Sequence, residues 1–170
     1  ESPNSDWIEE EDGPLKKVEK VFPQVALTES DKTITTDANG VITIPVAACS
    51  QPLSTEKIRF MKSYDEQFVQ MHYNLAGIRP ELRSYTVTLP EAGKYNFTAT
   101  VVTVTAERSF TIRANRRNMH DVPVPLTIGD WMETEPVPME LKAGRNKLQL
   151  TLKAPNKGLS IKCFTLTPVK

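Results

Sequence analysis

The chain has few of the residues that most often carry metal or redox chemistry. Its 170 residues include two cysteines and two histidines. Cys49 and Cys163 lie far apart and form no CxxC or Cys/His cluster, so the sequence gives no support to a zinc site or a thioredoxin-type redox pair. Two interpretations stay open for them: two buried free thiols, or one disulfide that joins an early strand to the last strand.

The chain also lacks an excess of charge of either sign. Lys plus Arg and Asp plus Glu each total 21, so the formal net charge is zero and no bulk field draws the protein to nucleic acid. No apolar run approaches the ~20 residues that a membrane-spanning helix needs. We therefore expect neither nucleic-acid binding nor membrane insertion. The chain begins at Glu1 rather than Met, which indicates a mature form or a fragment.

Long amphipathic helical patterns are absent as well, and thirteen prolines argue against helices. Residues 1–32 carry the acidic run 9–12 and show weak periodicity of either kind, which predicts a partly disordered linker or strap. Its apolar part, from Val21 to Leu27, is expected to lie on the main domain. From Thr33 the pattern changes to strands and turns, so residues 33–170 are predicted to form one β-sandwich module.

Strand signals run through this second region. Asn39-Gly40 stands between Ile34 and the apolar run 41–44, which predicts a tight hairpin. Apolar and polar residues alternate over 95–101 and again over 147–153, as in strands with one buried face. Eight or more short strands separated by turn residues predict an all-β protein with two packed sheets.

Five segments carry a resemblance to a known family: 85–95 (YTVTLPEAGKY), 110–115 (FTIRAN), 129–131 (GDW), 141–150 (LKAGRNKLQL) and 158–166 (GLSIKCFTL). Their order and spacing are similar to those of carbohydrate-binding modules of families 6 and 35, which share a galactose-binding-like jelly roll. The resemblance implies a non-catalytic accessory domain of a secreted bacterial protein. It also implies a secreted, cell-surface or periplasmic location and a glycan or polysaccharide as partner.

Sugar recognition needs a flat aromatic face for the apolar side of a pyranose and a few fixed hydrogen-bonding groups. The resemblance places Tyr64, Trp131 and Ser160 at the rim of the sandwich that binds sugar. We expect Tyr64 and Trp131 to stack on the ligand, with Asn115, Arg116 and Ser160 as polar partners. The alternative for Trp131 is a core or edge tryptophan that closes the sandwich.

The sequence departs from the family at several positions. Modules of this type often hold a structural calcium, but 46–49 (VAAC) stands where an early strand supplies a glutamate, and Lys162 stands where the closing strand supplies an acid. Because the matching oxygen ligands are missing, no cofactor is predicted. Thr134 occupies the place of a second aromatic residue. These departures motivate a second hypothesis: a structural or protein-interaction sandwich of a larger secreted protein, with other domains of that protein as partners.

Other candidate residues have plain structural explanations. The loop with Arg116 and Arg117 is suited to grip a carboxylate or sulfate, or it is an ordinary exposed turn. His72 and His120 have no cysteine or patterned carboxylates beside them. No Ser-His-Asp spacing, nucleophile elbow or phosphate-binding glycine loop is present, and Glu133 and Glu135 share one face of an extended segment. We therefore predict that the chain is not an enzyme.

Overall fold

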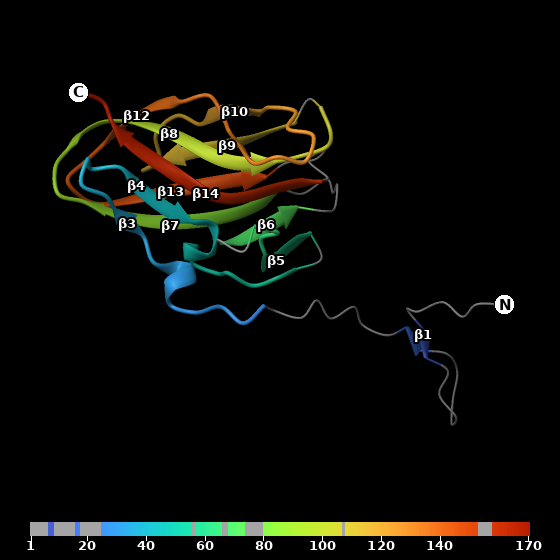
Figure 1. Cartoon of the computed structure of the whole chain (residues 1–170). Coiled ribbons are helices and arrows are strands. Elements are labelled where there is room, and N and C mark those ends of the chain that lie inside the picture. The colour runs from blue at the N-terminus through green and yellow to red at the C-terminus, as the bar shows by residue number, and fades with distance from the viewer. Residues whose placement is uncertain are drawn as a thin grey trace.

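The computed structural model describes residues 25–55, 57–65, 68–73, 80–106, 108–152 and 158–170, together with the backbone of β1 (Trp7–Ile8) and β2 (Lys16–Lys17), which pair with each other. In that part of the chain, strands are joined by loops and by two short 3-10 turns, η1 (Ser30–Lys32) and η2 (Val46–Ala48). Two sheets pack face to face (Figure 1). The prediction of an all-β, two-sheet sandwich is confirmed.

The smaller sheet is antiparallel, with strand order β10-β9-β13-β7. Its strands are β7 (Glu81–Leu89), β9 (Arg108–Ala114), β10 (His120–Val124) and β13 (Gly144–Leu152). Along β13, Leu148 and Leu150 are buried while Lys147 is exposed. Because successive strand residues point to opposite faces, this sheet has one apolar face in the core and one polar face towards solvent.

The larger sheet is centred on the last strand, β14. Its members are β3 (Thr35–Thr36), β4 (Ile42–Pro45), β5 (Ile58–Lys62), β6 (Val69–Tyr73), β8 (Gly93–Val102), β11 (Met132–Glu133), β12 (Val137–Leu141) and β14 (Leu159–Pro168). The main order is β11-β8-β14-β4-β3, with β12 also on β8, β6 also on β14, and β5 on β6. Figure 1 shows β14 running across the middle of this layer. Residues far apart in the sequence meet on its two sides.

Buried aromatic side chains join the two sheets. Tyr85 of the smaller sheet meets Phe164 of β14 edge to face, with ring centroids 5.1 Å apart, and Phe164 also stacks on Phe97 at 5.4 Å. The Tyr85 hydroxyl donates a hydrogen bond of 2.8 Å to the carbonyl of Val46. Burial raises the pKa of Tyr85 well above its ordinary value, so the hydroxyl stays protonated as a donor.

The predicted hairpin at Asn39-Gly40 is present. β3 and β4 pair as antiparallel strands, and Gly40 adopts a φ of 81° in the turn between them. The Asp37 carboxylate accepts hydrogen bonds from the backbone N–H groups of Asn39 and Val41 at 2.8 and 3.0 Å. Glycine takes this positive φ without steric cost, which is why the dipeptide forms the turn.

The N-terminal segment is described only in part. Val25 and Leu27 are partly buried and pack against the core, as expected for the apolar strap. Val21, Phe22 and the acidic run 9–12 lie outside the described residues. The domain boundary at 32/33 stays a prediction. Among the described residues, the chain forms no helix with the length and hydropathy of a membrane span.

The two cysteines are buried free thiols, which decides between the two interpretations that the sequence left open. Burial raises the pKa of both Cys49 and Cys163 above the ordinary thiol value. Cys163 Sγ lies 3.6 Å from the Thr100 hydroxyl oxygen. Since the thiolate is the reactive form, burial and the raised pKa both make these thiols less reactive than exposed ones.

Candidate functional site

Tyr64 and Trp131 come from distant parts of the sequence and stack on each other. Tyr64 lies in the turn after β5, and Trp131 directly precedes β11 at the edge of the larger sheet. Their ring centroids are 5.7 Å apart and their planes differ by 10°. The Tyr64 hydroxyl donates a hydrogen bond of 3.1 Å to the carbonyl of Gly129. The structure therefore brings the two predicted stacking residues together.

A short turn on the Trp131 side holds that ring in place. The Thr127 hydroxyl donates to the Thr103 carbonyl at 2.8 Å and accepts from the Thr103 N–H at 2.9 Å. The next two residues, Ile128 and Gly129, both have positive φ, at 50° and 92°. A β-branched residue with positive φ is strained, so the paired threonines hold the chain in a conformation that it would otherwise leave. This turn delivers Trp131 and the Gly129 carbonyl to Tyr64.

The Tyr64 turn is closed by hydrogen bonds of its own. Ser63 donates its backbone N–H to the Phe68 carbonyl at 2.8 Å and its hydroxyl to the Asp65 carboxylate at 2.6 Å. Ser63 is buried, whereas Tyr64 is 63% exposed. The turn therefore anchors one residue and presents the next to solvent.

Lys162 lies against the Trp131 ring. Its ammonium nitrogen is 4.9 Å from the centroid of the Trp131 ring and 5.6 Å from that of Phe68, and it forms an ion pair with the Asp65 carboxylate. The pairing of β14 with β8 shifts register between Ile161 and Cys163, so Lys162 is the extra residue of a β-bulge. A bulge re-aims the side chain it carries. Here it directs a cation at the face of an indole, a favourable electrostatic contact.

The sequence showed Lys162 as a missing calcium ligand and did not show its contacts with Trp131 and Asp65. One signal was present: a lysine, Lys162, stands between the apolar residues Ile161 and Cys163 of the closing strand. In a regular strand this lysine would point outward and its two neighbours would be buried. Among the described residues, no group of three His, Cys, Asp or Glu side chains is placed to hold a metal ion. The Lys162 ammonium, rather than a carboxylate, supplies the charge at this position.

Tyr64 is the more exposed ring of the aromatic pair. Trp131 is half-buried, and its Nε1–H is buried without a hydrogen-bond partner among the described residues. A sugar between two parallel rings needs a separation of about 7–8 Å, because each van der Waals contact spans about 3.5–4.0 Å. At 5.7 Å the pair is closed on itself. The gap between the rings therefore does not admit a pyranose, and the ring of the pair that faces solvent is that of Tyr64.

Ser160 is close to this region along β14, but its hydroxyl is already in use. The side chain is buried, and its oxygen is 2.7 Å from His72 Nδ1 and 3.4 Å from Gln70 Nε2. Burial lowers the pKa of His72, and the nearby Arg59 lowers it further. His72 is therefore a neutral partner of Ser160 at neutral pH. This network orders β6 against β14 and leaves a sugar-binding role of Ser160 as a prediction.

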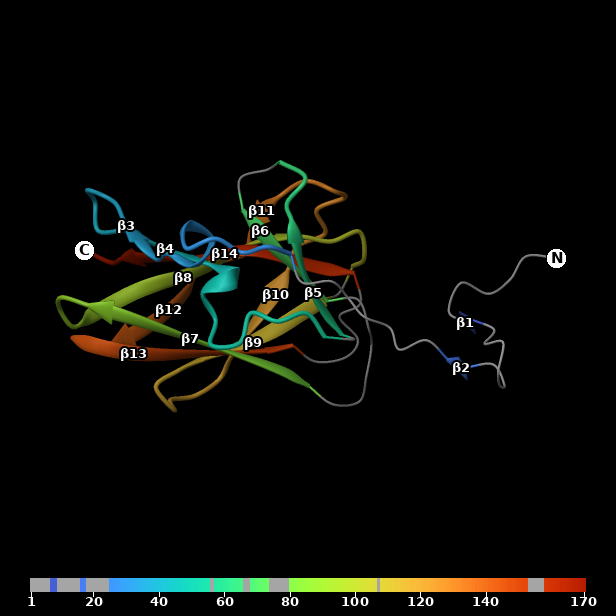
Figure 2. The same cartoon turned by 90° about the horizontal axis from the view of Figure 1, so that it is seen from below.

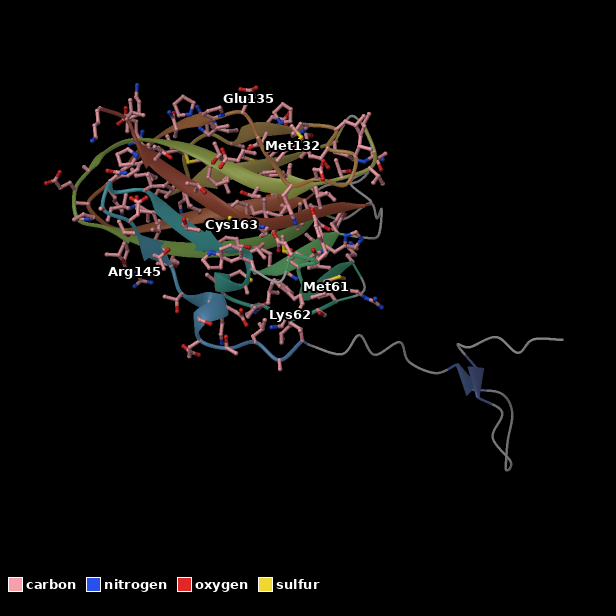
Figure 3. The ribbon with its side chains drawn as sticks, viewed as in Figure 1. Met61, Lys62, Met132, Glu135, Arg145 and Cys163 are labelled. Atoms are coloured by element: carbon pink, nitrogen blue, oxygen red, sulfur yellow. The ribbon has the colours of Figure 1, made fainter. Side chains whose placement is uncertain are left out.

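Asn115 and Arg116 lie at the other end of the sandwich. Met132, next to Trp131, pairs with Val101 near the end of β8, whereas β13 starts beside Leu89, just before the turn that leads into β8. Figure 3 labels Met132 and Arg145 at opposite ends, and Figure 2 shows β11 and the turn after β9 on opposite sides. The structure does not bring Asn115 and Arg116 to the aromatic pair.

Several solved carbohydrate-binding modules have a similar fold. The C-terminal family 6 module (CBM6) of LamC, a marine laminarinase from Zobellia galactanivorans, aligns with a TM-score of 0.60 at 17% identity, covering 75% of this chain and 98% of the module. The module CBM6cm-2 from Cellvibrio mixtus lichenase 5A, in complex with cellotriose, aligns with a TM-score of 0.59 at 20% identity, covering 75% and 97%. A family 35 module from Clostridium thermocellum aligns with a TM-score of 0.60 at 14% identity, covering 74% of this chain and 97% of the module.

The fold is that of the family 6 and family 35 carbohydrate-binding modules. The resemblance drawn from the sequence is thereby confirmed at the level of fold. No protein-family model matches the chain, and no curated protein matches it. At identities of this size the shared jelly roll shows the architecture alone, so the ligand has to be argued from the residues of this chain.

Proposed function

We propose that this chain is a non-catalytic carbohydrate-binding module that holds a glycan on the aromatic pair Tyr64 and Trp131. The observation that supports it most is the exposed Tyr64 ring, 63% accessible and parallel to Trp131 within 10°. A large flat aromatic surface exposed to water has few structural explanations, and it matches the apolar face of a pyranose. Asp130 and Glu133 are exposed beside the pair and carry oxygens suited to sugar hydroxyls.

The charge environment suits a neutral sugar. The Lys162 ammonium, 4.9 Å from the centroid of the Trp131 ring, is paired with Asp65, so it is not a free cation that would select an anionic sugar. Few groups are buried on contact with one open face, which implies weak to moderate affinity. Such a module gains retention when linked to a second binding or catalytic domain, because the link raises the effective concentration. We place it in a secreted, cell-surface or periplasmic protein of bacterial type, as an accessory domain.

The test is a screen of the full chain on a broad array of neutral oligosaccharides and polysaccharides. We expect binding to at least one β-linked or α-linked glycan, and loss of about tenfold or more in affinity for Tyr64→Ala, because a stacked ring contributes on the order of 1–3 kcal/mol. Trp131→Ala should lose binding too, because it removes the surface on which Tyr64 rests. Met119→Ala, an exposed apolar residue outside the site, is the control.

Tyr64→Phe refines the assignment. It keeps the ring and removes the hydroxyl that donates to the Gly129 carbonyl. Binding should fall by only a few-fold, because the ring supplies the stacking surface and the hydrogen bond only orients it. If Tyr64→Ala and Trp131→Ala bind glycans as well as the wild type, the aromatic pair is not the site.

A structural or protein-interaction role is the second candidate, and one observation favours it. Apolar side chains near the aromatic pair are unusually exposed: Ile128 at 77% and Val104 at 73%. A protein partner would cover them, whereas a sugar would not. Two results together would assign this role to the chain. It would bind no glycan on the array, and it would bind another domain of the parent protein in a way that Ile128→Ser abolishes.

A further inference from the structure

A polar pocket of about 520 Å³ lies over the smaller sheet beside the turn after β9. It is lined by Arg113, Asn115, Arg116, Lys142, Lys147 and Gln149. Four of these side chains are cationic and none is anionic. Gln149 alternates with buried Leu148 and Leu150, so the pocket is on the solvent face of the sheet. Its size is within the range of ~300–1,000 Å³ that is typical of small-ligand sites.

The positive charge of the pocket is not neutralised. No described carboxylate forms an ion pair with any of its four cations, and the ion pairs of the described chain involve other basic residues. The Nε donor of Arg113 is buried and lacks a hydrogen-bond partner among the described residues. Like charges at close range repel, and a bound anion would remove that repulsion.

The backbone that carries the lysines is locked in place. Asn146 is 1% exposed and hydrogen-bonds both to the N–H of Lys142, at 3.0 Å, and to its carbonyl, at 2.8 Å. Its Oδ1 also accepts from Asn115 Nδ2 at 2.6 Å, and Asn115 Oδ1 accepts from the Lys147 N–H at 2.8 Å. Asn115 and Asn146 therefore fix the backbone at both lysines before any ligand arrives.

Arg116 occupies a strained position in the same pocket. The Arg117 N–H donates to the Ala114 carbonyl at 2.9 Å, and the two residues between them, Asn115 and Arg116, have φ values of 51° and 66°. This is a type I′ turn, whose third position strongly favours glycine. Arginine at that position costs stability, and strained residues of this kind gather at functional sites.

We propose that this pocket binds the sulfate or carboxylate group of an acidic polysaccharide. Guanidinium groups pair with such groups through two parallel hydrogen bonds, and Lys147 of β13 and Lys142 of the turn before it add charge. The Gln149 amide offers a donor and an acceptor for sugar hydroxyls. Aromatic side chains are absent from the lining residues, so stacked nucleic-acid bases are disfavoured. The site is separate from the aromatic pair and does not depend on it.

The experiment is affinity electrophoresis of the full chain through gels that contain polygalacturonate, which has carboxylates only, carrageenan, which has sulfates only, or a neutral glucan. We expect retardation in one or both acidic gels that the neutral gel does not reproduce, and the gel that retards the chain names the anion. Arg116→Ala and Lys147→Ala should each weaken retention by about tenfold or more, as charge-assisted hydrogen bonds are worth roughly 1.5–3 kcal/mol. Arg117→Ala removes the same charge one residue away from the lining and should change retention less than about twofold.

Arg116→Gly tests the site in a variant whose loss of retention cannot be attributed to misfolding. It relieves the positive φ, so the unfolding temperature should equal or exceed that of the wild type, while retention in the acidic gel falls as for Arg116→Ala. Absence of retardation in both acidic gels would overturn the proposal. Equal losses of retention in Arg116→Ala and Arg117→Ala would also overturn it, and so would equal retention of the chain by double-stranded DNA. Either result would show that the chain is attracted by diffuse charge and not by a specific site. Tyr64→Ala should keep acidic retention, which separates failure of this site from failure of the aromatic one.

Discussion

The two ends of the sandwich place lysine in different surroundings. At the aromatic end, Lys162 is 9% exposed, pairs with Asp65 and lies over the Trp131 ring. At the pocket end, Lys142 and Lys147 line an open cavity and have no carboxylate partner among the described residues. The first lysine serves the fold, because its charge is neutralised where it stands. Lys142 and Lys147 keep their charge free for a ligand.

The two ends also differ in how they are assembled. The aromatic end joins two turns and a bulge that are far apart in the sequence, so its geometry depends on the packing of the whole larger sheet. The pocket is built on adjacent strands of one sheet and is locked by Asn146. Substitutions that act on one end should therefore leave ligand binding at the other unchanged. The following predictions test that independence.

Asn146→Ala should have the largest effect on stability. It removes the buried amide that satisfies Lys142 N–H and two carbonyl groups, those of Lys142 and Gly144. Each buried group left unpaired costs about 1–3 kcal/mol, so the free energy of unfolding should fall by roughly 3 kcal/mol in urea titrations. Retention in acidic gels should be lost while neutral-glycan binding at low temperature persists. Loss of both would show that the two ends are coupled.

Asp65→Asn should disturb the aromatic end selectively. It leaves the Lys162 ammonium without its ionic partner in a largely buried place, which should cost about 2 kcal/mol of stability. Neutral-glycan affinity should fall several-fold, because the amide keeps one acceptor oxygen in place of two, and that oxygen cannot serve both the Ser63 hydroxyl of the Tyr64 turn and the Lys162 ammonium. The control is Asp65→Asn combined with Lys162→Met, which should recover most of the lost stability. No recovery in the double variant would show that the ion pair is not the cause.

Salt should distinguish the two ends. Raising ionic strength from about 0.05 M to about 0.5 M shortens the screening length severalfold, so retention in an acidic gel should fall by about tenfold or more. Neutral-glycan affinity should change by less than about twofold over the same range, since stacking does not depend on screened charge. Parallel titrations at both salt concentrations measure this. Equal salt dependence at both ends would contradict the division of roles.

The smallest effect is expected from pH at His72. Its folded-state pKa is lowered by burial and by Arg59, while in the unfolded chain it titrates near its ordinary value of 6.5. As pH falls through that value the unfolded state binds the proton first, so the stability contributed by neutral His72 is present above it and declines below it. His72→Gln should flatten this decline in the unfolding temperature between neutral and mildly acidic pH. An unchanged slope in the variant would assign the decline to other groups.

The strands could be predicted from the sequence where apolar and polar residues alternate with the two-residue period of a strand. Alternation of apolar and polar residues in β8 and β13 required a half-buried strand, and Asn39-Gly40 required a tight turn, because few other sequences satisfy those geometries. The family resemblance placed Tyr64 and Trp131 on one rim. The structure stacks them, but their closure to 5.7 Å depends on the Thr127 turn, which no local pattern indicated.

The rest depended on strand order, which local patterns do not specify. Asn115 and Arg116 were grouped with the aromatic pair because they are polar loop residues, yet pairing of β9 with β13 places them at the other end. Ser160 was placed at the sugar-binding rim by the resemblance, and its register against His72, which no local pattern specifies, buries its side chain. The contacts of Lys162 with Trp131 and Asp65 were missed, because a bulge in one strand is visible only against the register of its neighbour.

The most direct test of the glycan-binding claim follows the Trp131 ring itself. In a Trp7→Phe background, Trp131 is the remaining tryptophan of the chain and its fluorescence reports on the aromatic pair. Titration with a neutral glycan that binds on the array should give a saturable change in emission with the same dissociation constant, and the change should vanish when Tyr64→Ala is added. A glycan that binds the chain while leaving Trp131 emission unchanged would contradict the account.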